Sequence, residues 1–239
     1  MERQPVFELR DVSLAKNGKH ILKGIHWKVA SGEVSVLLGP TGSGKTSLLR
    51  LLNRLDDPTS GEVLYMGEPV SSVDVLDLRK QVGMVLQKPF LFEGSVLDNI
   101  VYGAQLHGID VDVNRLRGLV GIPEGMLNQD VETLSAGQSQ KVSIARALAL
   151  KPKVLLLDEP TTGLDPTATL QVETLLNDLV RTLGVTCVFV THYIDQARRL
   201  GHRGMLIVDG ARVEEGEIRE MLSSPSDERT RKFMNGELQ

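Results

Sequence analysis

The sequence predicts an α/β fold in which a mainly parallel central sheet is flanked by helices, with an antiparallel β edge at the N-terminus and an inserted helical lobe. Short apolar runs, typical of strands buried on both faces, alternate with stretches whose apolar residues recur at helical spacing. Between residues 86 and 154 the strand-like runs are missing and helical patterns take their place. Strands that alternate with helices favour a parallel sheet, and the interruption indicates the helical insertion.

The N-terminal segment shows the alternation of half-buried strands. Residues 6 to 14 and 21 to 29 both switch between apolar and polar residues. In the second segment Ile25, Trp27 and Val29 share one face, because successive side chains of a strand point to opposite sides. This pattern predicts the antiparallel edge.

Continuous apolar runs predict the strands of the central sheet. They cover residues 34 to 38, 82 to 86, 154 to 157, 187 to 190 and 205 to 208. Such runs are expected where helices cover both faces of a sheet. The single cysteine, Cys187, begins one of them, so we expect a buried side chain and not a reactive thiol.

Helical patterns separate these runs. Apolar residues form one stripe within residues 48 to 55 and another within residues 172 to 183. The second has clear boundaries, because Asp165 can cap its start, Pro166 suits the first helical position and Gly184 can end it. In the insertion, a stripe from 113 to 120 precedes a longer helix after residue 135.

The composition limits the class of protein. With 24% charged and 41% apolar residues in 239, the chain resembles an ordinary soluble globular protein, which excludes the disordered and fibrous classes. A formal net charge of −4 gives no support for a broad nucleic-acid-binding surface, and we expect no nucleic-acid partner. No apolar run approaches the roughly 18 residues needed to cross a bilayer.

A glycine-rich segment between a predicted strand and a predicted helix matches the phosphate-loop pattern G-x-x-x-x-G-K-[ST]. Its glycines let backbone N–H groups surround an anion, and the helix N-terminus adds partial positive charge. Lys45 would reach the β and γ phosphates and Thr46 would bind Mg²⁺; the alternative is a structural glycine turn. The predicted phosphate-binding residues are Gly39, Pro40, Thr41, Gly42, Ser43, Gly44, Lys45, Thr46 and Ser47.

Two adjacent carboxylates, Asp158 and Glu159, follow the predicted strand at residues 154 to 157. Ligands of parallel sheets bind at the carboxyl ends of the strands. Asp158 would therefore hold Mg²⁺ through its coordination shell, and Glu159 could polarise an attacking water. Alternatively, Asp158 is a strand-end cap and Glu159 a solvated neighbour.

Five segments, in this order, resemble the ATP-binding-cassette ATPase family over nearly the whole chain. They are the phosphate loop, LSAGQ at 134 to 138, LLLDEP at 155 to 160, TGLD at 162 to 165, and VTH at 190 to 192. The resemblance implies ATP and Mg²⁺ as ligands. It also implies one ATPase domain over residues 1 to 239, with a RecA-like core and β subdomain at 1 to 88 and 147 to 239 and a helical signature subdomain at 89 to 146.

The resemblance further implies that the LSAGQ segment binds the γ-phosphate of ATP held by a second copy or a similar subunit. Ser135 would supply a hydroxyl and Gly137 a backbone N–H, with Ala136 and Gln138 in the same site. Ala136 replaces the commoner glycine and is tolerated only if its backbone is right-handed. Asp165 would communicate across the dimer, and it is also the predicted helix cap.

Two further residues gain a catalytic role only through the resemblance. Gln87 would approach Mg²⁺ and the attacking water and link the site to the helical lobe. His192 would contact the γ-phosphate and the water, beside the catalytic Lys45 and Glu159. Where relatives stack an aromatic ring on adenine, this chain has Lys16, so adenine binding is weaker or comes from elsewhere, such as His20. Gly163 replaces a common alanine, from which we conclude nothing.

The implied function is ATP hydrolysis that drives a separate membrane permease, from the cytoplasmic face of the membrane. The cluster Phe90-Leu91-Phe92 is where relatives receive a helix of the permease; the alternative is a local core under the helical lobe. Residues 87 to 100 are similar to phosphate-import ATPases and to iron-export and aluminium-resistance ATPases, with a slight preference for the second group.

Other classes explain the sequence less well. A soluble cassette protein that acts on ribosomes or DNA would carry a second phosphate loop or a long heptad tract, and neither is present. A phosphate-loop kinase or GTPase would leave LSAGQ and His192 without a role.

Overall fold

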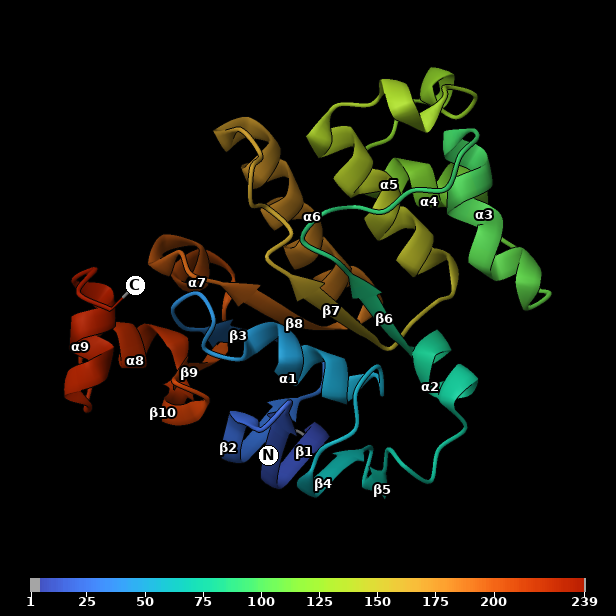
Figure 1. The fold of residues 1–239 in the computed structure, drawn as a ribbon. Coiled ribbons are helices and arrows are strands. Elements are labelled where there is room, and N and C mark those ends of the chain that lie inside the picture. Colours follow the sequence, from blue (N-terminus) through green and yellow to red (C-terminus); the bar gives the residue numbers. More distant parts are fainter. Residues whose placement is uncertain (1–4, 239) are drawn as a thin grey trace.

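Two β-sheets organise the protein, whose computed structural model describes residues 5–238 (Figure 1). The larger sheet has the order β10-β9-β3-β8-β7-β6, and its strands from β9 to β6 pair in parallel while β10 pairs antiparallel to β9. Its strands are β3 (Val34–Leu38), β6 (Val82–Val85), β7 (Val154–Asp158), β8 (Thr186–Thr191), β9 (Arg203–Val208) and β10 (Ala211–Glu217). The predicted parallel sheet is thus confirmed.

The smaller sheet is antiparallel, with the order β2-β1-β4-β5. Its strands are β1 (Pro5–Lys16), β2 (Lys19–Ala30), β4 (Ser60–Tyr65) and β5 (Glu68–Pro69). The side chains of Ile25, Trp27 and Val29 are buried, as the alternation predicted. The antiparallel edge is therefore a separate layer that lies beneath helix α1 in Figure 1.

Helix α1 (Lys45–Leu52) lies between the two sheets. Its leucines belong to the same core as Phe7 of β1, Ile25 of β2 and Val188 of β8. The neighbouring residue of β8, Phe189, faces the second core, which is formed with the helices on the other face of the sheet. Because every second residue of β8 enters a different core, the strand reads as one unbroken apolar run.

The remaining helices cover the second face and both ends of the large sheet. They are α2 (Val75–Gln81), α6 (Pro166–Leu183), α7 (Ile194–Leu200), α8 (Ile218–Ser223) and α9 (Glu228–Met234). Within residues 5–238 no helix is long and apolar enough to span a membrane. Leu55 and Leu183, which the predicted stripes included, are exposed, because α1 ends at Leu52 and Leu183 is the last residue of α6.

The helical lobe stands above one end of the parallel sheet (Figure 1). It contains α3 (Val96–Leu106), α4 (Val113–Val120), two short 3₁₀ helices (Glu124–Met126 and Val131–Thr133) and α5 (Ala136–Ala149). Helix α5 packs against α3 and α4 and also reaches β6 and α6, so it connects the lobe to the sheet. The division of the chain into subdomains at residues 88/89 and 146/147 stays a prediction.

Candidate nucleotide-binding site

The phosphate loop connects β3 to α1 at the carboxyl end of the parallel strands. A Cβ atom added at Gly39 would lie 2.2 Å from the backbone oxygen of Ile207, and Gly44 has a φ of +104°. Both positions require glycine, the first for space and the second for backbone conformation. The loop therefore leads into the N-terminus of α1, as the sequence predicted, and phosphate binding by residues 39 to 47 stays a prediction.

Lys45 lies at the centre of this loop. Its side chain is 5% exposed, and Nζ donates hydrogen bonds of 2.8 Å to the carbonyl oxygens of Gly39 and Pro40. Burial lowers the pKa of Lys45, against the opposing effect of Glu159 and Asp158. A buried ammonium held only by carbonyls and distant carboxylates favours an anionic ligand such as a phosphate. Ser43 Oγ is buried in the same loop and has no partner among the described residues.

Thr46 and Asp158, two of the predicted Mg²⁺ ligands, are hydrogen-bonded to each other. Thr46 Oγ1 donates to Asp158 Oδ2 at 2.9 Å and lies 3.1 Å from Oδ1. Burial raises the pKa of Asp158, and the hydrogen bond from Thr46 opposes that shift. The two side chains offer the hard oxygen ligands that Mg²⁺ prefers. In residues 5–238 no group of three or more His, Cys, Asp or Glu side chains could hold a metal ion.

Glu159 brings the predicted catalytic residues together. One carboxylate oxygen lies 3.8 Å from Lys45 Nζ, and the other lies 3.3 Å from His192 Nδ1. Gln87 Nε2 is 3.5 Å from the second oxygen. Glu159 has a positive φ of 43°, which is uncommon for a residue other than glycine and is often found at functional sites.

The LSAGQ segment begins α5 with a complete capping box. Ser135 Oγ accepts from the backbone N–H of Gln138 at 3.3 Å, and Gln138 Oε1 accepts from the backbone N–H of Ser135 at 2.8 Å. Ala136 lies in the first turn and has a negative φ, so the replaced glycine costs no backbone strain. A Cβ atom at Gly137 would lie 3.2 Å from the Cβ of Ala168, which gives this glycine a packing role as well.

Helix α5, which this segment begins, lies apart from the phosphate loop between β3 and α1 of its own chain (Figure 1). Ser135, Ala136 and Gln138 are exposed, and within residues 5–238 no hydrogen bond or ion pair joins the segment to residues 39 to 47. Asp165 caps α6 through Oδ1, which accepts from the N–H groups of Thr167 and Ala168 at 2.8 and 2.9 Å. The predicted cap is confirmed, and a role of Asp165 across a dimer stays a prediction.

Lys16, which stands where relatives stack an aromatic ring on adenine, is held by an ion pair. Lys16 Nζ forms an ion pair of 2.7 Å with Asp56, whose carboxylate also accepts a 2.6 Å hydrogen bond from Arg50 Nε. His20 is exposed near the start of β2. Lys16 is therefore held by charge and offers no aromatic face.

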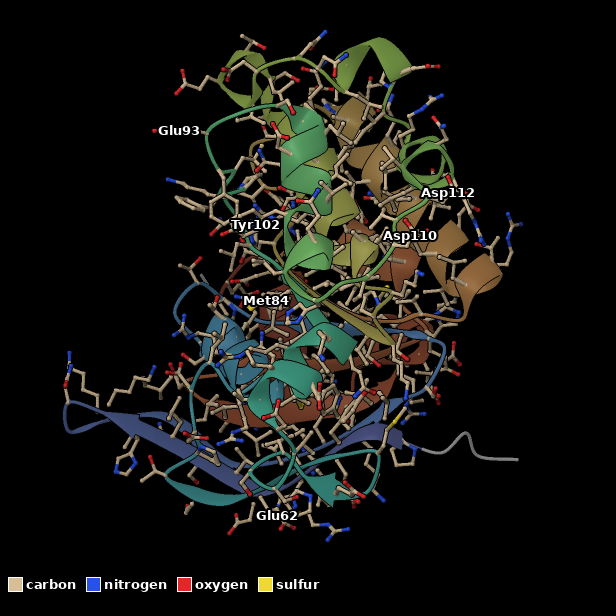
Figure 2. All side chains as sticks on the ribbon, turned by 90° about the vertical axis from the view of Figure 1, so that its right-hand side faces the viewer. Glu62, Met84, Glu93, Tyr102, Asp110 and Asp112 are labelled. Carbon is tan, nitrogen blue, oxygen red and sulfur yellow. The ribbon has the colours of Figure 1, made fainter. Side chains whose placement is uncertain are left out.

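The segment after Gln87 carries an exposed aromatic patch, which we define as Phe90, Phe92 and Tyr102. Phe90 is 65% exposed, and the Phe92 ring centroid lies 5.7 Å from that of Phe90 and 4.4 Å from that of Tyr102. The guanidinium of Arg146 lies 5.2 Å from the Phe92 ring and donates a 2.6 Å hydrogen bond to the backbone oxygen of Phe90. The local-core alternative is wrong for Phe90 and Phe92 and holds for Leu91, which packs against the core. Figure 2 shows Glu93 and Tyr102 on the same side of the helical lobe.

Sequence reasoning missed the contributions of Tyr102 and Arg146, and it missed Gln196. The side chain of Gln196 is buried between Thr161 and Thr191, behind Glu159 and His192. No local pattern marks these residues, because each acquires its neighbours only when distant segments meet.

Comparison with known proteins identifies the family. The family model described as ABC transporter matches residues 22–162. Protein STAR1 of Oryza sativa subsp. japonica is 44% identical over 200 residues, which are 82% of this chain and 58% of STAR1. The phosphate import ATP-binding protein PstB of Pseudoalteromonas translucida is 36% identical over 249 residues, 98% of this chain and 90% of that protein.

Solved structures agree. The structure of cbiO1 from Clostridium perfringens, part of the ABC transporter complex cbiONQ, has a TM-score of 0.86 and 31% identity and covers 93% of this chain and 92% of its own. An ATP-binding cassette in a dimeric post-hydrolysis state, bound to ADP and Pi, has a TM-score of 0.77 and 31% identity and covers 89% of this chain and 99% of its own. The chain belongs to the ABC transporter family and is an ATP-hydrolysing nucleotide-binding subunit that uses ATP with Mg²⁺.

Proposed function

We propose that this subunit dimerises around two ATP-Mg²⁺ and that closing and opening of the dimer drive a separate membrane permease, with the subunit on the cytoplasmic face. The observation that carries the proposal is the convergence of Lys45, Gln87 and His192 on the carboxylate of Glu159. These residues come from four segments of the chain, and they meet beside the Thr46–Asp158 pair.

Each residue has a stated task in this proposal. The N–H groups of residues 39 to 47 and the ammonium of Lys45 bind the β and γ phosphates and neutralise charge that develops on them. Thr46, Asp158 and Gln87 would hold Mg²⁺, which would supply additional charge neutralisation on the phosphate oxygens. Glu159 orients the attacking water and accepts its proton, and His192 holds that water and the γ-phosphate in line.

The second half of each site comes from the partner copy. Ser135 and the first residue of α5 are exposed, and in this proposal the Ser135 hydroxyl and the helix N-terminus bind the γ-phosphate of the opposite subunit. The capping box fixes Ser135 and Gln138 in the helical turn before any partner arrives. Preorganisation of this kind lowers the entropic cost of closing the dimer. Asp165 caps α6, the helix whose Ala168 lies against Gly137, and in this proposal it connects the two copies.

The aromatic patch is the docking surface for the permease. Its rings are exposed, and the guanidinium of Arg146 lies over the Phe92 ring. Two of the three rings, those of Phe90 and Phe92, follow Gln87 closely in the chain. Exposed aromatic and arginine side chains are enriched at protein interfaces. A permease helix that binds there can move the Gln87 segment relative to Glu159, and this coupling would join transport to hydrolysis.

The permease could transport one of two classes of substrate, metal ions or phosphate. Residues 87 to 100 favour metal-ion export by their similarity to export-type ATPases. Phosphate import is supported by the likeness to PstB, which extends over 98% of the chain. The neighbouring permease gene separates the two: an extracellular binding protein encoded beside it favours import, and its absence favours export.

The transport role can be tested with a variant in which only the aromatic patch is changed. A Phe90→Ser, Phe92→Ser double variant should keep the ATP hydrolysis of the isolated subunit and lose co-purification with the integral membrane protein. The matched control is Leu76→Ser on α2, an exposed leucine outside the patch. Unchanged association of the double variant, or co-purification of the wild type with ribosomes and with no membrane protein, contradicts the proposal.

A further inference from the structure

Behind the groups that face the nucleotide, a chain of buried hydrogen bonds joins two loops of the site. The hydroxyl of Thr191, at the end of β8, donates to Oε1 of Gln196 at 2.8 Å. Nε2 of Gln196 donates to Oγ1 of Thr161 at 2.8 Å, and the backbone N–H of Tyr193 donates to Oγ1 of Thr191 at 3.0 Å. His192 is thus flanked on both sides by residues that this chain of hydrogen bonds restrains.

The three side chains of this network are almost completely buried. Thr191 is 2% exposed, and Gln196 and Thr161 are each 5% exposed. The amide of Gln196 uses its carbonyl toward one threonine and its N–H toward the other, so both ends are satisfied. Satisfied polar networks in the interior hold their members in one arrangement, because a buried polar group without a partner is costly.

Beyond Thr161, the segment that carries the network is hydrogen-bonded to Glu159 through Thr162. The backbone N–H of Thr162 donates to the Glu159 carbonyl at 3.1 Å, and Thr162 Oγ1 donates to the Glu159 carboxylate at 3.2 Å. The N–H of Leu164 donates to the Thr161 carbonyl at 3.2 Å, which closes the turn that leads to Asp165. Residues 159 to 165 therefore form one hydrogen-bonded segment, and Thr161 is its attachment to Gln196.

A cavity of about 670 Å³ borders these two loops and is lined by Thr161, Leu164, His192, Tyr193 and Gln196 among others. Beside this cavity, the hydrogen bonds through Gln196 join the segment at Thr161 to the segment at Thr191.

We infer that Gln196 is a positioning residue for ATP hydrolysis: it sets the placement of His192 relative to Glu159 and transmits a displacement of residues 161 to 165 to His192. Gln196 acts through Thr191 and Thr161 and makes no contact with ATP itself. The inference rests on the proposed roles of Glu159 and His192. Because residues 161 to 165 end in the residue proposed to face the partner copy, Gln196 makes the hydrolytic geometry depend on the state of the dimer.

The experiment separates positioning from stability with two variants. Gln196→Met keeps the length of the side chain but removes both hydrogen bonds, so the buried hydroxyls of Thr161 and Thr191 both lose this partner. We expect kcat to fall about tenfold or more while the KM for ATP changes less than about twofold, together with a lower Tm. Adding Thr161→Val replaces the second partner by an apolar group of the same shape, which should restore much of the Tm.

The restored stability should not restore hydrolysis. In the Thr161→Val, Gln196→Met protein kcat should stay low, because the connection between the two loops is still absent. If kcat rises together with Tm, or if Gln196→Met alone keeps the wild-type kcat, the network is only structural and the inference is wrong.

Two controls complete the test. Thr230→Val removes another fully buried hydroxyl, bonded to Glu214 on the edge strand β10, and should lower Tm with unchanged kcat. His192→Ala tests the proposed site itself: wild-type hydrolysis in that variant would refute the role of His192, whereas a loss there with normal kcat in Gln196→Met would refute only the inference.

Discussion

Nδ1 of His192 lies 3.3 Å from Oε2 of Glu159, although the two residues follow different strands of the sheet. Glu159 comes directly after β7 and His192 directly after β8, and these strands are parallel neighbours with Asp158 opposite Val190. The contact lacks hydrogen-bond geometry, and Nδ1 has no other partner among the described residues. The register of two parallel strands therefore brings an acid and an imidazole to the place where ligands of such sheets bind.

Complementation between two inactive variants tests the composite site. Lys45→Ala and Ser135→Ala should each abolish most hydrolysis, because each removes one half of both sites in a homodimer. A mixture of the two proteins should regain activity, since a mixed dimer has one site with both residues intact and one with neither. ATP hydrolysis of the mixture against each protein alone is the measurement, and no recovery would indicate that Ser135 serves its own subunit.

Asp165 has a structural role that can be separated from a role across the dimer. Asp165→Ala removes the cap of α6 and should cost about 1 kcal/mol of stability. Asp165→Asn keeps a cap of similar strength and removes the charge. We expect the asparagine variant to melt like the wild type and hydrolyse ATP more slowly; equal hydrolysis would leave Asp165 as a cap only.

Lys16 gives a prediction for nucleotide affinity. Lys16→Tyr places a ring where relatives stack adenine, and stacking of a base on an aromatic side chain contributes roughly 1–3 kcal/mol. The KM for ATP should fall at least several-fold. Lys16→Met is the control, because it breaks the ion pair with Asp56 without adding a ring. Equal KM values for the two variants would show that the base does not bind beside residue 16.

Much of this arrangement could be predicted from the sequence, because its signals are local. The phosphate loop, the acidic strand end and the cap at Asp165 are each written within a few neighbouring residues. The Lys16–Asp56 ion pair, the Phe92–Arg146 contact and the role of Gln196 could not be predicted. Each joins segments that are far apart in the chain, and no periodicity records which polar side chains will meet when the sheet forms.

Glu214 predicts how acid affects stability. Burial raises the pKa of Glu214, but hydrogen bonds from Thr230, Ser226 and the N–H of Asp227 outweigh it and hold the pKa below its ordinary value of 4.5. A lowered pKa in the folded protein means that the carboxylate stabilises the fold above pH 4.5, and that this contribution is lost as pH falls through the folded pKa.

Glu214→Gln should therefore lower the free energy of unfolding at pH 7 by about 1–2 kcal/mol, because it removes charged hydrogen bonds. The difference from the wild type should shrink as pH falls below 4.5, the ordinary value. Thermal melts from pH 7 downward give the measurement. A constant difference at every pH would show that the charge of Glu214 contributes nothing to anchoring α9.

Glu159→Gln tests the central claim most directly, because the amide keeps the size of the side chain and cannot accept the proton of the attacking water. The exposed Glu68→Gln on β5 is the matched control and should behave as the wild type. With ATP and Mg²⁺, size-exclusion chromatography and phosphate release should show that Glu159→Gln accumulates as an ATP-bound dimer with turnover reduced about a hundredfold or more. Normal phosphate release, or a monomer that never retains ATP, would contradict the account.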